Sequence, residues 1–175
     1  EQLNEQIDEF LFQISKYFQL TDTHKVLEYL IQRYHIYEYN VDSLIGAFLP
    51  YHETRIFIRL LQTCSAVKNP QNYRFYWMKK FQENGVPITK SNLLKHCLSD
   101  LEFTHYVTDS IFKGLRYDPN NSMFPSFLLS FCMNLMQRST KDMIVSHILS
   151  VISRCIRRHA ENSQLFIVAY MLFSH

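Results

Sequence analysis

The stretch LPYHETRIFIRLLQ, residues 49–62, combines a histidine, an acid and two arginines with a run of large apolar residues. A histidine beside a carboxylate is the usual composition of a general acid–base pair, and arginines hold anions. Catalysis would also need a nucleophile or a second carboxylate beside His52, and the sequence places neither there. We therefore interpret LPYHE as a corner between two helices, with Glu53 in the first turn of the second, where the helix dipole favours an acid.

On a helical wheel, the segment that follows the corner divides into a wide apolar arc and a narrow polar strip. The wide arc indicates burial on two sides, as in an inner helix of stacked pairs. His52, Arg55 and Arg59 lie on the polar strip and are candidates for contact with a partner. These arginines either pair with acids of a neighbouring helix, for which Glu38 and Asp42 are close in chain order, or reach an external partner.

A second basic group, Arg74, Lys79 and Lys80, lies in the aromatic segment YRFYWMKKFQ. Such a mixture can combine phosphate contacts with base stacking and so bind RNA. The alternative is an amphipathic helix with its aromatic residues in the core and its bases in solvent. We favour this alternative because a short helix here must bury much of its apolar material. The three basic residues remain partner-binding candidates, and a cluster at Arg154, Arg157, Arg158 and His159 has the same two interpretations, since cations stabilise a helix C-terminus.

A metal site is a weaker hypothesis. Cys155 and His159 are four residues apart, a spacing at which two helical side chains can share one ion. A second pair with suitable spacing is missing, because His96 and Cys97 are adjacent and point in different directions on a helix. The four cysteines form no CxxC pair and are interpreted as buried thiols in a reducing compartment. The sequence predicts neither a metal nor a cofactor.

The amino-acid composition favours an all-helical fold. Apolar residues make up 47% of the 175 residues and aromatic residues 15%, while glycine occurs only 3 times. Sandwiches, barrels and phosphate-binding loops use glycine freely, so we expect helices joined by polar turns and no glycine-rich nucleotide site. The net charge is only +2, but residues 1–42 carry three basic and eight acidic side chains. We expect a polarised surface and no membrane span, since charges interrupt every apolar run.

Apolar residues recur at helical spacing along almost the whole chain. The expected helices cover approximately residues 2–18, 21–34, 40–49, 52–66, 73–82, 89–99, 101–115, 125–137, 141–158 and 164–175. Short turns between them predict antiparallel pairs, each close to HEAT-repeat length. We therefore expect one domain over residues 1–175, an all-α HEAT-like solenoid of helical hairpins. The last helix is apolar with no polar face after it, which predicts a fragment of a longer array.

Several short sequence motifs match those of a known family. They are Tyr39-Asn40 with Asp42-Ser43-Leu44-Ile45, the run from Leu49 to Phe57, Gly85-Val86-Pro87 and His96-Cys97. In these motifs, and over about Glu1 to Phe112, the chain resembles the N-terminal region of the large HEAT-repeat proteins associated with the U-three small nucleolar ribonucleoprotein. From about Leu115 onward we find no motif of this family, and the resemblance there is limited to the helical character of the sequence.

The resemblance implies a nucleolar, non-catalytic scaffold of the small-subunit processome. Such proteins support transcription of pre-ribosomal RNA and maturation of the small-subunit RNA. The implied partners are other processome scaffold proteins, with contact to pre-ribosomal or small nucleolar RNA as a further option, and no small-molecule substrate. A direct RNA-binding helical-repeat module is the alternative function.

Overall fold

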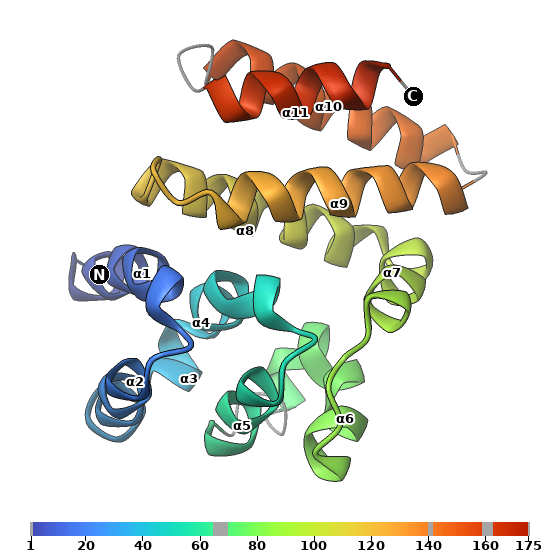
Figure 1. Ribbon diagram of the computed structural model, residues 1–175. Coiled ribbons are helices and arrows are strands. Elements are labelled where there is room, and N and C mark those ends of the chain that lie inside the picture. The colour runs from blue at the N-terminus through green and yellow to red at the C-terminus, as the bar shows by residue number, and fades with distance from the viewer. Residues whose placement is uncertain (1, 65–69, 140–141, 159–162, 175) are drawn as a thin grey trace. The chain divides into compact units, whose positions relative to one another are not determined.

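The computed structural model describes residues 2–64, 70–139, 142–158 and 163–174, and every regular element in these ranges is a helix (Figure 1). Contacts divide the chain into two compact units, Glu1–Asn92 and Leu93–His175, each described below by itself. The all-α expectation is confirmed. The expectation of one repeat domain across residues 1–175 stays a prediction. Within the described ranges, no helix combines the length and hydropathy that a bilayer crossing requires.

The first unit contains α1 to α6 and the start of α7. The bounds are α1 Gln2–Ile14, α2 Thr21–Tyr34, α3 Ile36–Tyr39, α4 Val41–Phe48, α5 Arg55–Thr63, α6 Lys79–Asn84 and α7 Lys90–Ser99, with 3-10 turns η1 Ser15–Tyr17, η2 Leu49–Tyr51 and η4 Pro70–Met78. Helix α1 packs against α4, and α5 packs against α6. Segment 73–82, expected as one helix, is mostly the 3-10 helix η4, followed by α6.

Helix α5 begins directly after Thr54, whose side chain caps it. The Thr54 hydroxyl accepts a hydrogen bond from the Phe57 N–H at 3.2 Å, which satisfies one of the free donors of the first turn. Pro50 lies in η2, and the chain turns through His52 and Glu53 before α5 starts. Residues 49–53 therefore form the corner that the sequence predicted. The residue types at Thr21, Asp22 and Asn40 also predict caps for α2 and α4, but no side-chain capping bond forms at the start of either helix.

The predicted apolar stripes of the first two helices are correct only in part. Helical spacing places Leu3, Ile7, Phe10, Leu11, Ile14 and Phe18 on the first stripe and Val26, Leu27, Leu30, Ile31 and Tyr34 on the second. Ile7, Leu11 and Leu27 are buried, but Leu3 is 52% exposed and Val26 39% exposed. Phe12, which is not in the predicted stripe, is fully buried. Periodicity identifies the helix, while neighbouring elements decide how wide its buried face is.

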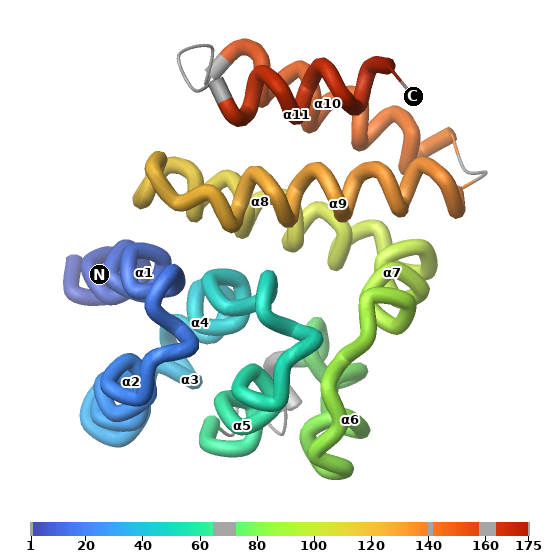
Figure 2. Tube along the Cα trace, viewed as in Figure 1, coloured from blue at the N-terminus to red at the C-terminus, as the bar shows by residue number. Residues whose placement is uncertain are grey.

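The second unit contains most of α7 and four longer helices. Their bounds are α8 Leu101–Tyr117, α9 Met123–Arg138, α10 Asp142–Arg158 and α11 Ser163–Phe173. Successive helices from α8 to α11 reverse direction, as the chain trace in Figure 2 shows. Helix α9 packs against α8, α10 and α11. All four ranges agree with the sequence prediction to within two residues.

Two polar contacts join α8 to α10. The Thr108 hydroxyl lies 3.1 Å from Nε2 of His147, and Arg154 donates a hydrogen bond to Asp109 at 2.8 Å. The His105 and His147 rings lie 4.2 Å apart. Burial, then the neighbouring His105 and Arg154 charges, lower the pKa of His147 to about 4, against the opposing effect of Asp109. The unprotonated ring is therefore the form that this helix pair stabilises.

The free energy of unfolding is expected to fall as the pH drops from about 6.5 to about 4, because unfolded His147 takes up a proton near pH 6.5 and folded His147 near pH 4. After allowance for partial exposure, we expect this residue to contribute about 1 kcal/mol of the loss. Urea unfolding at several pH values should show a shallower pH dependence for His147→Gln than for the unchanged protein. Equal slopes for the two proteins would contradict the contribution assigned to His147.

Candidate functional site

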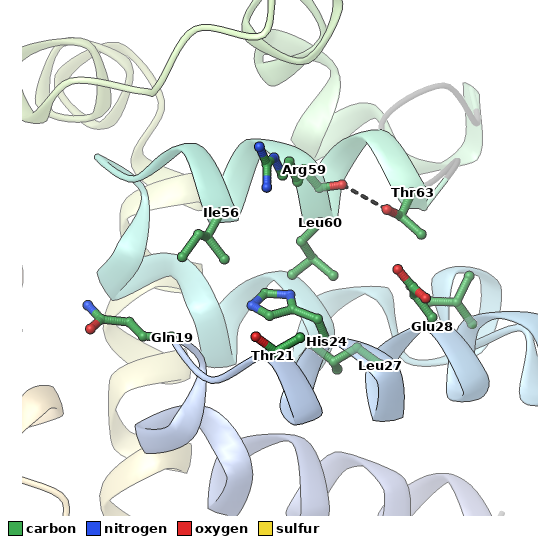
Figure 3. Close-up of a pocket in the computed structure, with 10 residues that line it drawn as sticks. Gln19, Thr21, His24, Leu27, Glu28, Ile56, Arg59, Leu60 and Thr63 are labelled. Atoms are coloured by element: carbon green, nitrogen blue, oxygen red, sulfur yellow. Dashed lines mark hydrogen bonds between the residues drawn. The ribbon is translucent and has the colours of Figure 1, made fainter.

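A groove of about 290 Å³ lies between α2 and α5 in the first unit. Its lining residues are Gln19, Thr21, His24, Leu27, Glu28, Ile31, Ile56, Arg59, Leu60 and Thr63. Figure 3 shows Ile56 and Leu60 directed from α5 toward His24 and Leu27. The groove is smaller than most sites for whole small-molecule ligands, and its size suits a side chain of a partner.

The wall formed by α2 is fixed to the preceding turn. His24 Nε2 lies 2.7 Å from the Phe18 carbonyl oxygen, and the Thr23 hydroxyl donates to the Tyr17 carbonyl at 2.7 Å. The rings of His24 and Phe18 lie 5.0 Å apart, and Phe18 is fully buried. These contacts hold the start of α2 in one position, so the groove is a preformed feature of the unit.

The floor of the groove is apolar and its edges carry two opposite charges. Leu27, Ile31 and Leu60 are buried at the base. Arg59 on α5 and Glu28 on α2 are exposed, and neither forms an ion pair within the residues that the structure describes. An unpaired arginine beside an apolar floor can donate hydrogen bonds to a carboxylate of a partner, while an apolar side chain of the same partner packs on the floor. The arrangement is suited to binding a segment of a partner.

The other sequence-predicted candidates are not part of this groove. Arg55 is exposed one helical turn before Arg59 and also has no ion pair in the described ranges. Arg74 pairs with Asp42 at 2.9 Å. Lys79 lies 3.9 Å from Glu83, and Lys80 lies over the Phe81 ring at 4.9 Å. The expected internal acid is thus Asp42, but it pairs with Arg74 and not with Arg55 or Arg59.

His52 is not on the polar surface strip where the helical wheel placed it. Its side chain is 3% exposed, and Nδ1 lies 2.6 Å from the Ile88 carbonyl oxygen. The Ile88 N–H donates in return to the His52 carbonyl at 3.0 Å. Burial lowers the pKa of His52, so the neutral ring joins the corner to the segment before α7. We correct its role from a partner contact to a structural one.

In the aromatic segment, the favoured core interpretation holds for some residues. Phe75, Met78 and Phe81 are buried, while Tyr73 and Tyr76 are 71% and 57% exposed. The sequence predicts burial of Phe75, Trp77, Met78 and Phe81, and this is confirmed for all of them except Trp77, which is half-buried. Lys79 lies 5.3 Å from the centre of the exposed Tyr76 ring, an arrangement that also fits the RNA-binding alternative.

All four cysteines are buried free thiols, as predicted. Burial raises the pKa of Cys97 and Cys132 to about 12, which makes both thiols poor nucleophiles. Among the described residues, no three histidine, cysteine or acidic side chains are placed to hold a metal ion. His159, the proposed partner of Cys155, lies outside the described residues, as do the side chains of the C-terminal cluster from residue 158 on.

Comparison with known proteins identifies relatives of this helical chain. It is 43% identical over 115 residues, or 66% of its length, to HEAT repeat-containing protein 1 of Homo sapiens. It is 32% identical over 169 residues, or 97% of its length, to HEAT repeat-containing protein 1 homolog of Dictyostelium discoideum. The chain is a homologue of these HEAT-repeat proteins. The predicted class, an all-α HEAT-like solenoid of helical hairpins, is confirmed.

The chain is also similar to a protein that carries a different name. The chain is 27% identical over 137 residues, or 78% of its length, to U3 small nucleolar RNA-associated protein 10 of Debaryomyces hansenii. This chain spans 5% of the human relative and 7% of the Dictyostelium and Debaryomyces relatives. No protein-family model matches the chain. The human match covers 66% of the chain, whereas the Dictyostelium match covers 97% and so extends beyond Leu115.

Proposed function

We propose that this chain is a protein-binding section of a non-catalytic scaffold in the small-subunit processome, in the nucleolus. There it supports transcription of pre-ribosomal RNA and maturation of the small-subunit RNA. The main support for the proposal is homology to HEAT repeat-containing protein 1 and to a second protein that is named as associated with the U3 small nucleolar RNA. Stacked helical hairpins present extended faces to partners, which suits a scaffold.

Within this function, the groove between α2 and α5 is the proposed contact with another processome protein. We expect an apolar side chain of the partner on the floor formed by Leu27 and Leu60, with an acidic side chain paired to Arg59. Buried apolar floors supply most of the affinity in such contacts, and the charge at the edge fixes the orientation of the bound segment.

Crosslinking with mass spectrometry on the intact processome tests this proposal. Lys25 lies on α2 within one turn of Glu28, so its amine should crosslink to lysines of a second protein. The partner found in this way should be recovered far less with Arg59→Glu than with Arg59→Lys. Lys113→Glu, an exposed change on α8 outside the groove, is the matched control and should leave recovery unchanged. Absence of the chain from the particle would overturn the proposed function, whereas equal recovery of all three variants would overturn only the groove.

Direct RNA binding is the second candidate function. It is favoured by Arg55 and Arg59 on α5, which form no ion pair among the described residues, and by the exposed Tyr76 ring under Lys79. Cations beside exposed aromatic rings form the usual composition of a surface that binds single-stranded RNA.

A further inference from the structure

Five aromatic side chains lie together in sequence at the end of α2 and along α3. Tyr29, Tyr34 and Tyr39 are 58%, 38% and 68% exposed, His35 is exposed and Tyr37 is half-buried. We call these residues the tyrosine patch. The sequence RYHIYEY carries most of the patch, although spacing had assigned Tyr34 to the buried stripe. Exposed tyrosines gathered in one place are typical of protein interfaces, because each ring adds contact area at a small entropy cost.

Contacts between neighbours order the patch. The rings of Tyr29 and Tyr34 meet edge to face at 6.1 Å. His35 Nδ1 lies 3.1 Å from the Tyr37 hydroxyl oxygen, and their rings are also edge to face, at 5.8 Å. These contacts limit ring motion before any partner arrives, which lowers the entropy lost on binding.

The backbone holds the same region in an uncommon conformation. His35 has φ of +50°, which places a residue other than glycine in the left-handed region between α2 and α3. The N–H groups of Glu38 and Tyr39 both donate to its carbonyl oxygen, at 2.8 Å and 3.4 Å. A histidine in this conformation is strained, because its Cβ lies close to the following carbonyl oxygen. Because α3 starts directly after it, this turn sets the positions of Tyr37 and Tyr39 on the surface.

The charge around the patch is negative. Residues 26–42 carry three acidic side chains and a single arginine; Asp42 is paired with Arg74, which leaves Glu28 and Glu38 against Arg33. Glu38 is exposed between Tyr37 and Tyr39, and it forms no ion pair within the described ranges. An acidic surface repels the phosphates of RNA and attracts basic side chains. Tyrosine faces attract arginine and lysine as well.

We propose that the tyrosine patch binds a basic segment of a partner protein, with arginine or lysine side chains over the tyrosine rings and paired with Glu38. This surface is separate from the groove at Arg59, and the proposal holds whether or not the processome assignment is correct. Each cation over an exposed ring contributes about 0.5–1 kcal/mol, so two rings account for about a tenfold change in affinity.

A fluorescence anisotropy titration of the 175-residue chain tests the proposal. The probe is a short labelled peptide of alternating arginine and glycine, and the comparators are the same peptide with glutamate for arginine and a short oligouridylate. We expect saturable binding of the arginine peptide alone. Failure of the arginine peptide to bind, or tighter binding of the oligouridylate, would overturn the proposal.

Three variants localise the binding. Tyr29→Ser with Tyr39→Ser should weaken it about tenfold, while the corresponding phenylalanine pair should keep it within about twofold because the ring faces remain. Tyr73→Ser with Tyr76→Ser removes two other exposed tyrosines of the same unit and should have little effect. Circular dichroism should show unchanged helix in each variant, since the replaced side chains are exposed. Equal affinity for the patch and control pairs would show that the arginine peptide binds elsewhere.

Discussion

Replacing Gly114 with alanine is expected to lower the free energy of unfolding by about 2–3 kcal/mol. A Cβ atom at this position of α8 would lie 2.5 Å from two ring carbons of Phe124 and 2.6 Å from a third. Phe124 is fully buried in α9, so its ring has no open space to move into. Urea unfolding followed by circular dichroism measures the difference.

A second substitution separates this steric contact from a loss of helix propensity. Alanine favours helix more than glycine does, so propensity alone predicts a gain in stability. Phe124→Leu alone should be destabilising, but in the Gly114→Ala background it should relieve part of the clash. The double variant should therefore be more stable than the sum of the two single effects predicts. Strict additivity, or a stabilising Gly114→Ala, would show that α8 and α9 are not packed as closely as the structure has them.

The outer face of α11 is expected to cause concentration-dependent self-association of this chain. Its exposed apolar residues are Phe166, Ile167, Tyr170, Met171 and Phe173, each between 42% and 71% exposed. The opposite face, with Leu165 and Leu172, is buried. Contiguous apolar surface on a single helix associates in water because burial removes it from solvent.

Light scattering or sedimentation over a range of protein concentrations measures the association. Ile167→Ser with Phe173→Ser should weaken it at least about tenfold, since each large side chain contributes about 1.5–3 kcal/mol when fully buried. Leu3→Ser with Leu20→Ser is the matched control, because these residues are 52% and 57% exposed in the first unit. A chain that stays monomeric at every concentration, or a control that acts as strongly, would refute this role of α11.

Helix positions were largely predictable because the periodicity of apolar residues is a local signal. The ranges of α8 to α11 follow from spacing alone, as does the corner before α5. Gly85 ends α6 in the left-handed conformation with φ of +63°, which a glycine before Val-Pro favours. Local residue types decide these features, so no tertiary information is needed.

Contacts between distant residues were not predictable in the same way. The wheel placed His52 in solvent because it assumed a helix at that residue, whereas a hydrogen bond to Ile88 buries it. Asp42 was named as an internal acid, but its partner Arg74 is 32 residues away in sequence. Several arrangements of helices satisfy the same apolar pattern, and only the packing selects among them.

The sequence identified only some of the residues that form the two candidate surfaces. Arg59 was found because a charge on a polar strip stands out, but its neighbours Leu27 and Glu28 on α2 required the tertiary structure. Tyrosine at helical spacing is counted as apolar, so Tyr34 was assigned to the core and Tyr29 was not considered. A separate search for clustered tyrosines in acidic surroundings could have found the patch.

The affinity of this chain for pre-ribosomal RNA at physiological salt tests the central claim most directly. If the chain is a protein-binding scaffold, the RNA affinity will be weak and nonspecific, and Arg55→Ala with Arg59→Ala will change it little. If the arginines form an RNA path with Lys79 and Lys80, binding will be tight and steeply salt-dependent, and each lost charge will lower the salt slope by roughly one unit. Tight binding that disappears in the folded double-alanine variant would contradict the scaffold account.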